Sequence, residues 1–125
     1  MSATTIVKTY LETMEARDLP RATSMLAPDF AMVFPGAARF TRLADVVAWA
    51  KPRYRWAKKR YERFDEVPAA GGETIVYCFG TLYGEWPDGR SFEDIRFIDR
   101  FVIRDGKLAD QRVWNDLAEA RSGRG

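Results

Sequence analysis

The sequence contains no histidine, and this absence excludes a large part of enzyme chemistry. A serine or cysteine nucleophile activated by histidine, a zinc ion bound by histidine, and an imidazole acid or base are all ruled out. Any proton transfer must therefore use a carboxyl, phenol or lysine side chain. Because Cys78 is the only cysteine, a transition-metal site is not expected either, and we expect no cofactor.

Cysteines and long apolar segments are equally scarce. Cys78 has no partner for a disulfide bond within the chain, which fits a reducing compartment. No stretch approaches the ~18 apolar residues that a membrane helix needs. Residues 1–7 lack the basic start and apolar run of a secretion signal. We therefore expect a cytoplasmic protein without a membrane partner.

The overall composition is that of an ordinary globular domain: of 125 residues, 46% are hydrophobic, 14% aromatic and 30% charged. A chain of this length buries about two-thirds of its unfolded surface, which leaves room for a core with an internal pocket. We expect one domain over residues 1–118 and a frayed tail over residues 119–125. The net charge of +2 is too small to indicate a nucleic-acid partner.

Hydrophobic periodicity predicts helices in the first half of the chain and strands in the second. Asp18 and Pro20 are typical of the start of a short second helix, which Pro28 would end. The predicted helices span residues 4–16, 18–28 and 43–55, and the predicted strands span residues 30–34, 60–67, 73–85, 91–104 and 108–116. This order predicts an α+β domain in which an antiparallel sheet wraps over the helices.

The strand over residues 91–104 carries an acid on its apolar face. Alternation of side chains places Asp99 between Phe97 and Phe101 on the inner face. Burial among aromatic rings raises the pKa of a carboxyl group unless a donor or a cation compensates. Two interpretations stay open at this point: a structural carboxylate paired with a buried arginine or backbone amide, or a functional group in a pocket.

The turn at Trp86–Arg90 determines which side chains share that face with Asp99. Pro87 and Gly89 suit a type I turn followed by a bulge, and this loop would place Tyr77 opposite Asp99 with Phe79 beside it, both inward. A two-residue turn would instead direct the alternate residues inward, namely Cys78 and Leu82.

The turn at Asp105–Gly106 has a similar interpretation, in which Ile103 pairs with Lys107. The inward residues of the last strand would then be Ala109, Gln111, Val113 and Asn115. Trp114 would face outward, where an exposed tryptophan is more often an interface anchor than a ligand contact. We therefore expect a homodimer that forms through the outer face of the sheet.

Taken together, these patterns resemble the nuclear-transport-factor-2-like superfamily, which includes SnoaL-like polyketide cyclases and ketosteroid isomerases. The resemblance covers nearly the whole chain. It rests on residues 6–10, 18–20 and 26–30 in the first part and on residues 97–101 and 105–108 in the last. It implies a cone-shaped, cystatin-like α+β fold in which N-terminal helices pack in a curved, mostly antiparallel sheet.

The resemblance also implies roles for two side chains. Tyr10 looks like the first-helix tyrosine of ketosteroid isomerases and Asp99 looks like their strand carboxylic acid, which together form an oxyanion hole. The isomerase base belongs at the end of the first strand, where this chain has Val33-Phe34-Pro35 and no carboxylate. The resemblance to SnoaL-like cyclases, which need only one aspartate, implies that Asp99 would exchange a proton with an enolisable aromatic polyketide. Tyr10 with Gln111 or Asn115 would orient the carbonyl group.

Other activities of the superfamily lack residues that they require. Epoxide-hydrolase relatives need a second inward aspartate where this chain has Val113, and dehydratase and dehydrochlorinase relatives need a histidine. We therefore expect a SnoaL-like pocket protein that transfers a proton on a small apolar carbonyl compound, as an isomerase, cyclase or dehydratase-type enzyme. A non-catalytic ligand-binding or dimerising module is the alternative. The expected substrate-binding residues are Phe30, Phe34, Tyr77, Phe79, Phe97, Phe101, Gln111 and Asn115.

A basic segment over residues 51–63 contains seven lysines or arginines among thirteen residues, with Glu62 as its only acid and three aromatic residues interleaved. The favoured interpretation is a solvated helix end and edge strand, because clustered cations discourage pairing at a sheet edge. An anionic small molecule is a second candidate for this segment. Single-stranded nucleic acid is a third and less favoured candidate.

Overall fold

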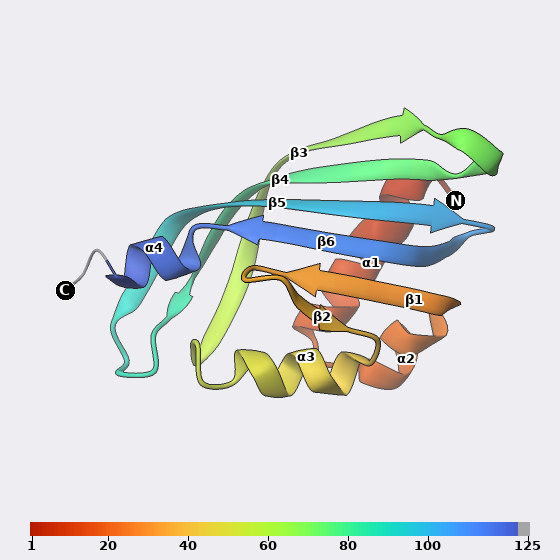
Figure 1. Ribbon diagram of the computed structural model, residues 1–125. Helices are drawn as coiled ribbons and strands as arrows, with labels where there is room; N and C mark the ends of the chain where they lie inside the picture. The colour runs from red at the N-terminus through yellow and green to blue at the C-terminus, as the bar shows by residue number, and fades with distance from the viewer. Residues whose placement is uncertain (123–125) are drawn as a thin grey trace.

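The computed structural model describes residues 1–122, and it shows four α-helices and one six-stranded sheet (Figure 1). The helices are α1 (Ala3–Glu15), α2 (Leu19–Ser24), α3 (Leu43–Ala50) and α4 (Leu117–Ser122). The strands are β1 (Leu26–Phe34), β2 (Ala38–Phe40), β3 (Trp56–Pro68), β4 (Thr74–Glu85), β5 (Ser91–Arg104) and β6 (Lys107–Asn115), and a short 3₁₀ turn, η1 (Ala70–Gly72), joins β3 to β4.

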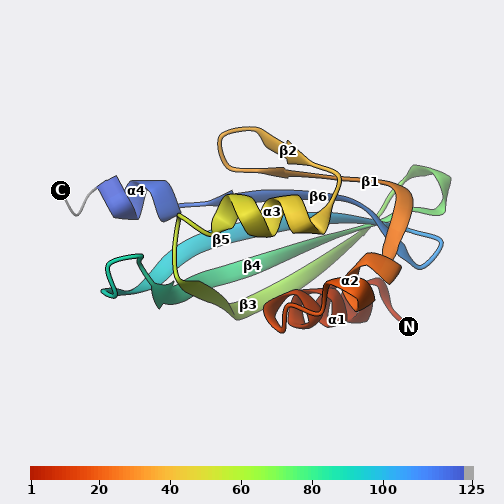
Figure 2. The ribbon, with the colours of Figure 1, turned by 90° about the horizontal axis from the view of Figure 1, so that it is seen from below.

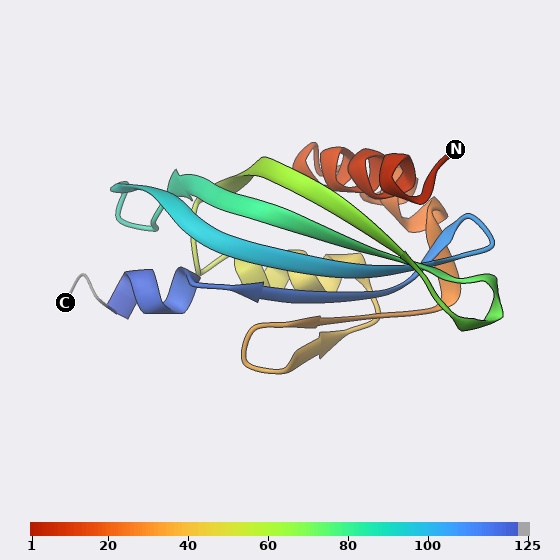
Figure 3. The same ribbon diagram turned by 90° about the horizontal axis from the view of Figure 1, so that it is seen from above.

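The sheet is ordered β2-β1-β6-β5-β4-β3, and every pairing is antiparallel except that of β1 with β6. Helices α1 and α3 cover one face of it (Figure 2), where Val7 and Tyr10 of α1 pack with Phe101 of β5 and Leu108 of β6. The strands converge toward the end that carries the β5–β6 turn and spread apart toward the other end (Figures 2 and 3). This arrangement is the expected α+β cone.

The first two helices begin where local chemistry predicts. The Ser2 hydroxyl accepts a hydrogen bond from the backbone N–H of Thr5 and so caps α1. Asp18 caps α2 in the same way, with Pro20 in the first turn. The apolar stripe of α1 faces the sheet and buries Tyr10, as its spacing predicts.

Several boundaries differ from the sequence prediction. Helix α2 ends at Ser24 and β1 begins at Leu26, so Pro28 lies within the strand. The pairing of β1 with β6 is irregular between Leu26 and Ala31, where the missing N–H of a proline removes no ladder bond. Helix α3 ends at Ala50, five residues earlier than predicted, ahead of a turn that contains Pro52. The short strand β2 was not predicted.

The predicted register of β4 against β5 is wrong by one residue, although the turn between them is as expected. The Trp86 N–H donates to the Arg90 carbonyl oxygen at 2.8 Å. A bulge then follows on β5, where Asp94 adopts a left-handed φ of 59°. The extra residue reverses the faces of β4, so Cys78 pairs with Asp99 and faces inward. Tyr77 and Phe79, predicted inside, lie half-buried on the outer face.

A two-residue turn joins β5 to β6, so Arg104 and not Ile103 pairs with Lys107. Asp105 and Gly106 both have positive φ, at 51° and 73°, as a type I′ turn requires. A bulge at Ala109 then adds one residue to β6, so the residues beyond it face the sides that were predicted. Ala109 itself was predicted to face inward, but it packs with Val102 on the outer face. The three remaining inward predictions for this strand are confirmed: Gln111, Val113 and Asn115.

Strand β3 forms one edge of the sheet, as the favoured interpretation of the basic segment predicts. It bends sharply in its middle (Figure 1), next to a bulge between Tyr61 and Arg63. Helix α4 occupies the start of the segment that we expected to be a frayed tail, and the rest of that segment, residues 123–125, lies outside the described residues.

Candidate functional site

A cavity of about 170 Å³ lies between the inner face of the sheet and helices α1, α3 and α4, and it is partly open to solvent. Its lining is mainly apolar and includes aromatic side chains from four separate parts of the chain, namely Phe34, Trp49, Trp86 and Phe97. An engineered cavity of about 150 Å³ takes up benzene. The cavity therefore has room for one aromatic ring, and its opening allows a longer molecule to extend outward.

The structure brings six of the ten predicted site residues to this cavity: Tyr10, Phe34, Phe97, Asp99, Gln111 and Asn115. Phe30 and Phe101 are buried in the core behind it and do not line it. Tyr77 and Phe79 lie on the opposite face of the sheet because of the bulge at Asp94. The aromatic wall is completed instead by Trp49 and Trp86, which the sequence analysis did not identify.

Asp99 is the deepest charged group of the site, with a relative exposure of 1%. Neither carboxyl oxygen accepts a hydrogen bond from any residue that the structure describes. Burial raises the pKa of Asp99, and the Lys59 ammonium group, 3.8 Å from Oδ2, opposes that rise. The partner is thus a lysine at ion-pair distance, and not the arginine or backbone amide that a structural role predicted. Buried polar atoms without a hydrogen-bond partner are rare, so the two Asp99 carboxyl oxygens call for an explanation.

Two neutral side chains stand near Asp99. Burial, and then the nearby Asp99, raise the pKa of the Tyr10 phenol, so this group remains a proton donor at neutral pH. Its ring packs edge-on against Phe101 at 6.2 Å between centroids. Burial and Asp99 likewise raise the pKa of the Cys78 thiol to about 12, which leaves the thiol protonated and unsuited to nucleophilic chemistry.

Lys59 is the main residue of the site that sequence reasoning missed. It lies on the edge strand β3, opposite the inward residue Leu82. Its backbone N–H donates to the Glu15 carboxylate at 3.3 Å, which ties the strand to the end of α1. Its ammonium group also lies 5.3 Å from the centre of the Phe97 ring. The predicted strand begins one residue later, at Arg60, so the sequence analysis did not predict that Lys59 faces inward.

Replacing Lys59 with methionine should raise the pKa of Asp99 further, because it removes the cation that opposes the effect of burial. The shift can be measured from the pH titration of the Asp99 carboxyl carbon by NMR. Lys58→Met is the matched control, since Lys58 is exposed and pairs with Tyr83 on the outer face. Identical Asp99 titrations in the two variants would show that the Lys59 charge does not influence the pKa of Asp99.

Residues 1–122 contain no cluster of three or more carboxylate, thiol or imidazole groups that could hold a metal ion. Over the same residues, no helix is long and apolar enough to cross a membrane. The polar side chains that line the cavity include those of Asp99, Tyr10, Lys59, Gln111 and Asn115.

Comparison with known proteins gives a family and a fold. The model of the SnoaL-like domain family matches residues 7–111 of the chain. No curated protein sequence is significantly similar to it.

Solved structures match over nearly the whole length of both chains. A nuclear-transport-factor-2-like protein of unknown function from Burkholderia pseudomallei is 22% identical, with a TM-score of 0.75, over 98% of this chain and 97% of the other. TerC, co-crystallised with polyporic acid, is 16% identical with a TM-score of 0.75 over 94% and 93%. A putative polyketide cyclase from Pseudomonas putida is 19% identical with a TM-score of 0.61 over 91% of each chain. At these identities the likeness establishes the fold alone.

Proposed function

This chain belongs to the SnoaL-like domain family of the nuclear-transport-factor-2-like superfamily, and from that premise we propose that it transfers a proton on a small apolar carbonyl compound held in its cavity. The observation that carries the proposal is the Asp99 carboxyl group, which is buried at the cavity wall without a hydrogen-bond partner. A group of this kind, in a cavity that a ligand can enter, is a candidate acid or base.

The proposed reaction has two proton steps. The ionised Asp99 takes a proton from the carbon next to the carbonyl group, and the negative charge moves to the carbonyl oxygen, which becomes an enolate. The Tyr10 phenol donates a hydrogen bond to that oxygen, and the Lys59 cation favours both the ionised Asp99 and the enolate. Protonated Asp99 then returns the proton to a carbon of the enolate. Acid–base catalysis by one positioned group contributes about 10²- to 10⁴-fold.

A single carboxyl group carries both steps in this scheme. The only other acid that lines the cavity within the described residues is Glu15, which is exposed and accepts the backbone N–H of Lys59. The end of β1 contributes Phe34 and Pro35 to the cavity and no carboxyl group. A base that is separate from Asp99, as ketosteroid isomerases would need, therefore has no counterpart here.

The test is deuterium exchange in deuterium oxide, followed by proton NMR, with a panel of one-ring aromatic ketones and 1,3-diketones. The proposal predicts saturable loss of the signal from the proton next to the carbonyl group. A compound that raises the melting temperature but exchanges no faster than in buffer would support the alternative, a non-catalytic binding module. The co-crystal of TerC with polyporic acid supports small-molecule binding by this fold in either case.

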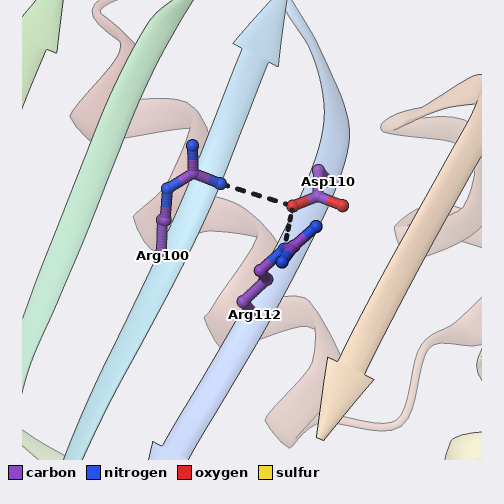
Figure 4. A network of polar contacts seen from close by, with 3 residues as sticks. All are labelled: Arg100, Asp110 and Arg112. Atoms are coloured by element: carbon purple, nitrogen blue, oxygen red, sulfur yellow. Dashed lines mark hydrogen bonds and ion pairs between the residues drawn. The ribbon is translucent and has the colours of Figure 1, made fainter. Parts of the chain in front are cut away.

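We also propose that the outer face of the sheet pairs with a second copy of the chain. Trp114, with 53% of its surface exposed, lies beside Ile98, with 38% exposed, on that face. Asp110 lies between Arg100 and Arg112 on the same face, 3.5 and 3.3 Å from their guanidinium groups (Figure 4). An exposed aromatic anchor beside mixed charges suits a self-complementary contact about a twofold axis.

Trp114→Glu should convert this dimer into a monomer, because the substitution places a charge in the centre of the desolvated contact. Light scattering coupled to gel filtration measures the change as a halving of the mass. Ala44→Glu, on the exposed side of α3, adds the same charge away from the sheet and should leave the mass unchanged. A wild-type protein that is monomeric at high concentration would contradict the proposal.

A further inference from the structure

The charges that line the cavity are uneven. Its cations are Arg17, Arg53, Lys59 and Arg121, and its acids are Glu15 and Asp99. Lys59 lies at ion-pair distance from Asp99, and Glu15 accepts the backbone N–H of Lys59. Residues 1–122 form nine ion pairs, one of which joins Lys59 to Asp99. None of the nine includes Arg17, Arg53 or Arg121.

The three arginines come from segments that meet at one end of the molecule. Arg17 follows α1, Arg53 follows α3, and Arg121 lies in the last turn of α4. Figure 2 shows that these ends of α1, α3 and α4 all lie toward the side where the strands spread apart. The side chains of all three arginines line the cavity, and that of Arg17 also donates to the Met14 carbonyl oxygen at 2.6 Å.

Arg53 is held in place although it is exposed. Its guanidinium carbon lies 3.7 Å from the centre of the Trp49 ring, which indicates stacking. Trp49 is fixed in turn by edge-on contact with Phe34, at 5.5 Å between ring centres. A stacked guanidinium keeps its N–H edges free, and two of those N–H groups match the spacing of a carboxylate. Arg53 is thus a pre-positioned hydrogen-bond donor for an anion on a wall of the cavity.

We propose that the compound bound in the cavity carries an anionic oxygen group, of the carboxylate type, which Arg53 and Arg121 bind at the wide end while the ring enters the cavity. The inference rests on the proposed function, since it places the carbonyl group beside Asp99 and Tyr10. An anionic small molecule was the second candidate partner for the basic segment over residues 51–63, and here one residue of that segment, Arg53, would bind it. Of the seven lysines and arginines of that segment, Arg53 and Lys59 line the cavity.

Two fluorescent probes with the same ring system test the inference. 1-Anilinonaphthalene-8-sulfonate carries an anionic group, and N-phenyl-1-naphthylamine lacks it. The wild-type protein should bind the sulfonate more tightly, and the Arg53→Gln/Arg121→Gln double variant should lose about tenfold or more of that affinity. Binding of the neutral probe should stay unchanged. The double variant Arg39→Gln/Arg42→Gln is the control, since both of these arginines are exposed and lie outside the cavity lining.

The outcomes separate this inference from the proposed function. If the double variant binds both probes as the wild type does, or if the control loses as much sulfonate affinity, the inference is wrong and the cavity still binds apolar rings. If the wild type binds neither probe, the inference and the proposed cavity function both fail. A selective loss of sulfonate affinity in the Arg53/Arg121 variant supports the inference. Circular dichroism of each variant verifies that the fold is retained.

Discussion

Asp99→Asn is expected to lower the catalysed deuterium exchange by about 10²- to 10⁴-fold while the protein stays folded. The amide has the shape of the carboxyl group and accepts no proton from carbon, so the loss reports on proton transfer and not on packing. Binding of an apolar probe should persist in this variant. Asp110→Asn, which neutralises a carboxylate on the outer face, is the control and should exchange as the wild type does. Equal exchange in the Asp99 variant and the wild type would refute the mechanism.

The same variant has a second expected effect, on stability as a function of pH. The pKa of Asp99 is raised above its ordinary value of 3.8 in the folded state, mainly by burial. Between the ordinary pKa of the unfolded chain and the raised pKa of the folded state, the folded protein binds more protons than the unfolded chain. The free energy of unfolding therefore falls as pH rises through this window. Asp99→Asn lacks this group, and its stability should exceed that of the wild type increasingly across this window. Urea unfolding at a series of pH values measures the difference, and parallel pH profiles would contradict it.

Gly80→Ala should have a large effect on stability, with a loss of about 3 kcal/mol or more. A Cβ atom at this position would lie 2.0 Å from the Arg60 carbonyl oxygen and 3.0 Å from the Phe97 ring. The first of these neighbours is backbone of the paired strand β3, beside its bulge, so relief requires the strand to move. Urea denaturation of the purified variant measures the loss, and failure to obtain folded protein would be its extreme form.

Gly36→Ala provides the contrast for this prediction. A Cβ atom at Gly36 meets nothing within 4 Å, but its φ of 83° is unfavourable for alanine. That variant should lose only about 1 to 2 kcal/mol, the cost of a left-handed conformation. If Gly80→Ala lost no more than Gly36→Ala, the close approach of β3 to β4 would not limit stability.

Part of the site follows from local patterns in the sequence. The spacing of apolar residues in α1 determines that Tyr10 faces the sheet, and the alternation in β5 does the same for Asp99. Both patterns act within one element, where neighbouring residues along the chain determine which side is buried. For this reason the pair could be predicted without knowledge of how the strands align.

The rest of the site depends on alignment between strands, which local patterns do not encode. One residue, Asp94, adopts a left-handed conformation in a bulge and thereby exchanges the faces of β4, so Tyr77 and Phe79 were placed on the wrong side. The Lys59 ammonium group lies 3.8 Å from Asp99 although β4 separates their two strands, a contact that local patterns do not predict. Trp49 and Arg53 contribute to the cavity through the packing of α3, which the sequence predicts as a helix but cannot position.

The parallel pairing of β1 with β6 also bears on the order of folding. Strands β3 to β6 follow one another through short turns, whereas Leu26 must find Leu108 from the far side of that whole unit. Closing so long a loop costs more chain entropy than closing the turns, so the four-strand meander should assemble first and the N-terminal segment should dock last. The cavity takes its walls from both parts, and it is therefore completed only at that final step. A bound ligand would then hold α1 and β1 in place against detachment, and it should slow hydrogen exchange in these two elements.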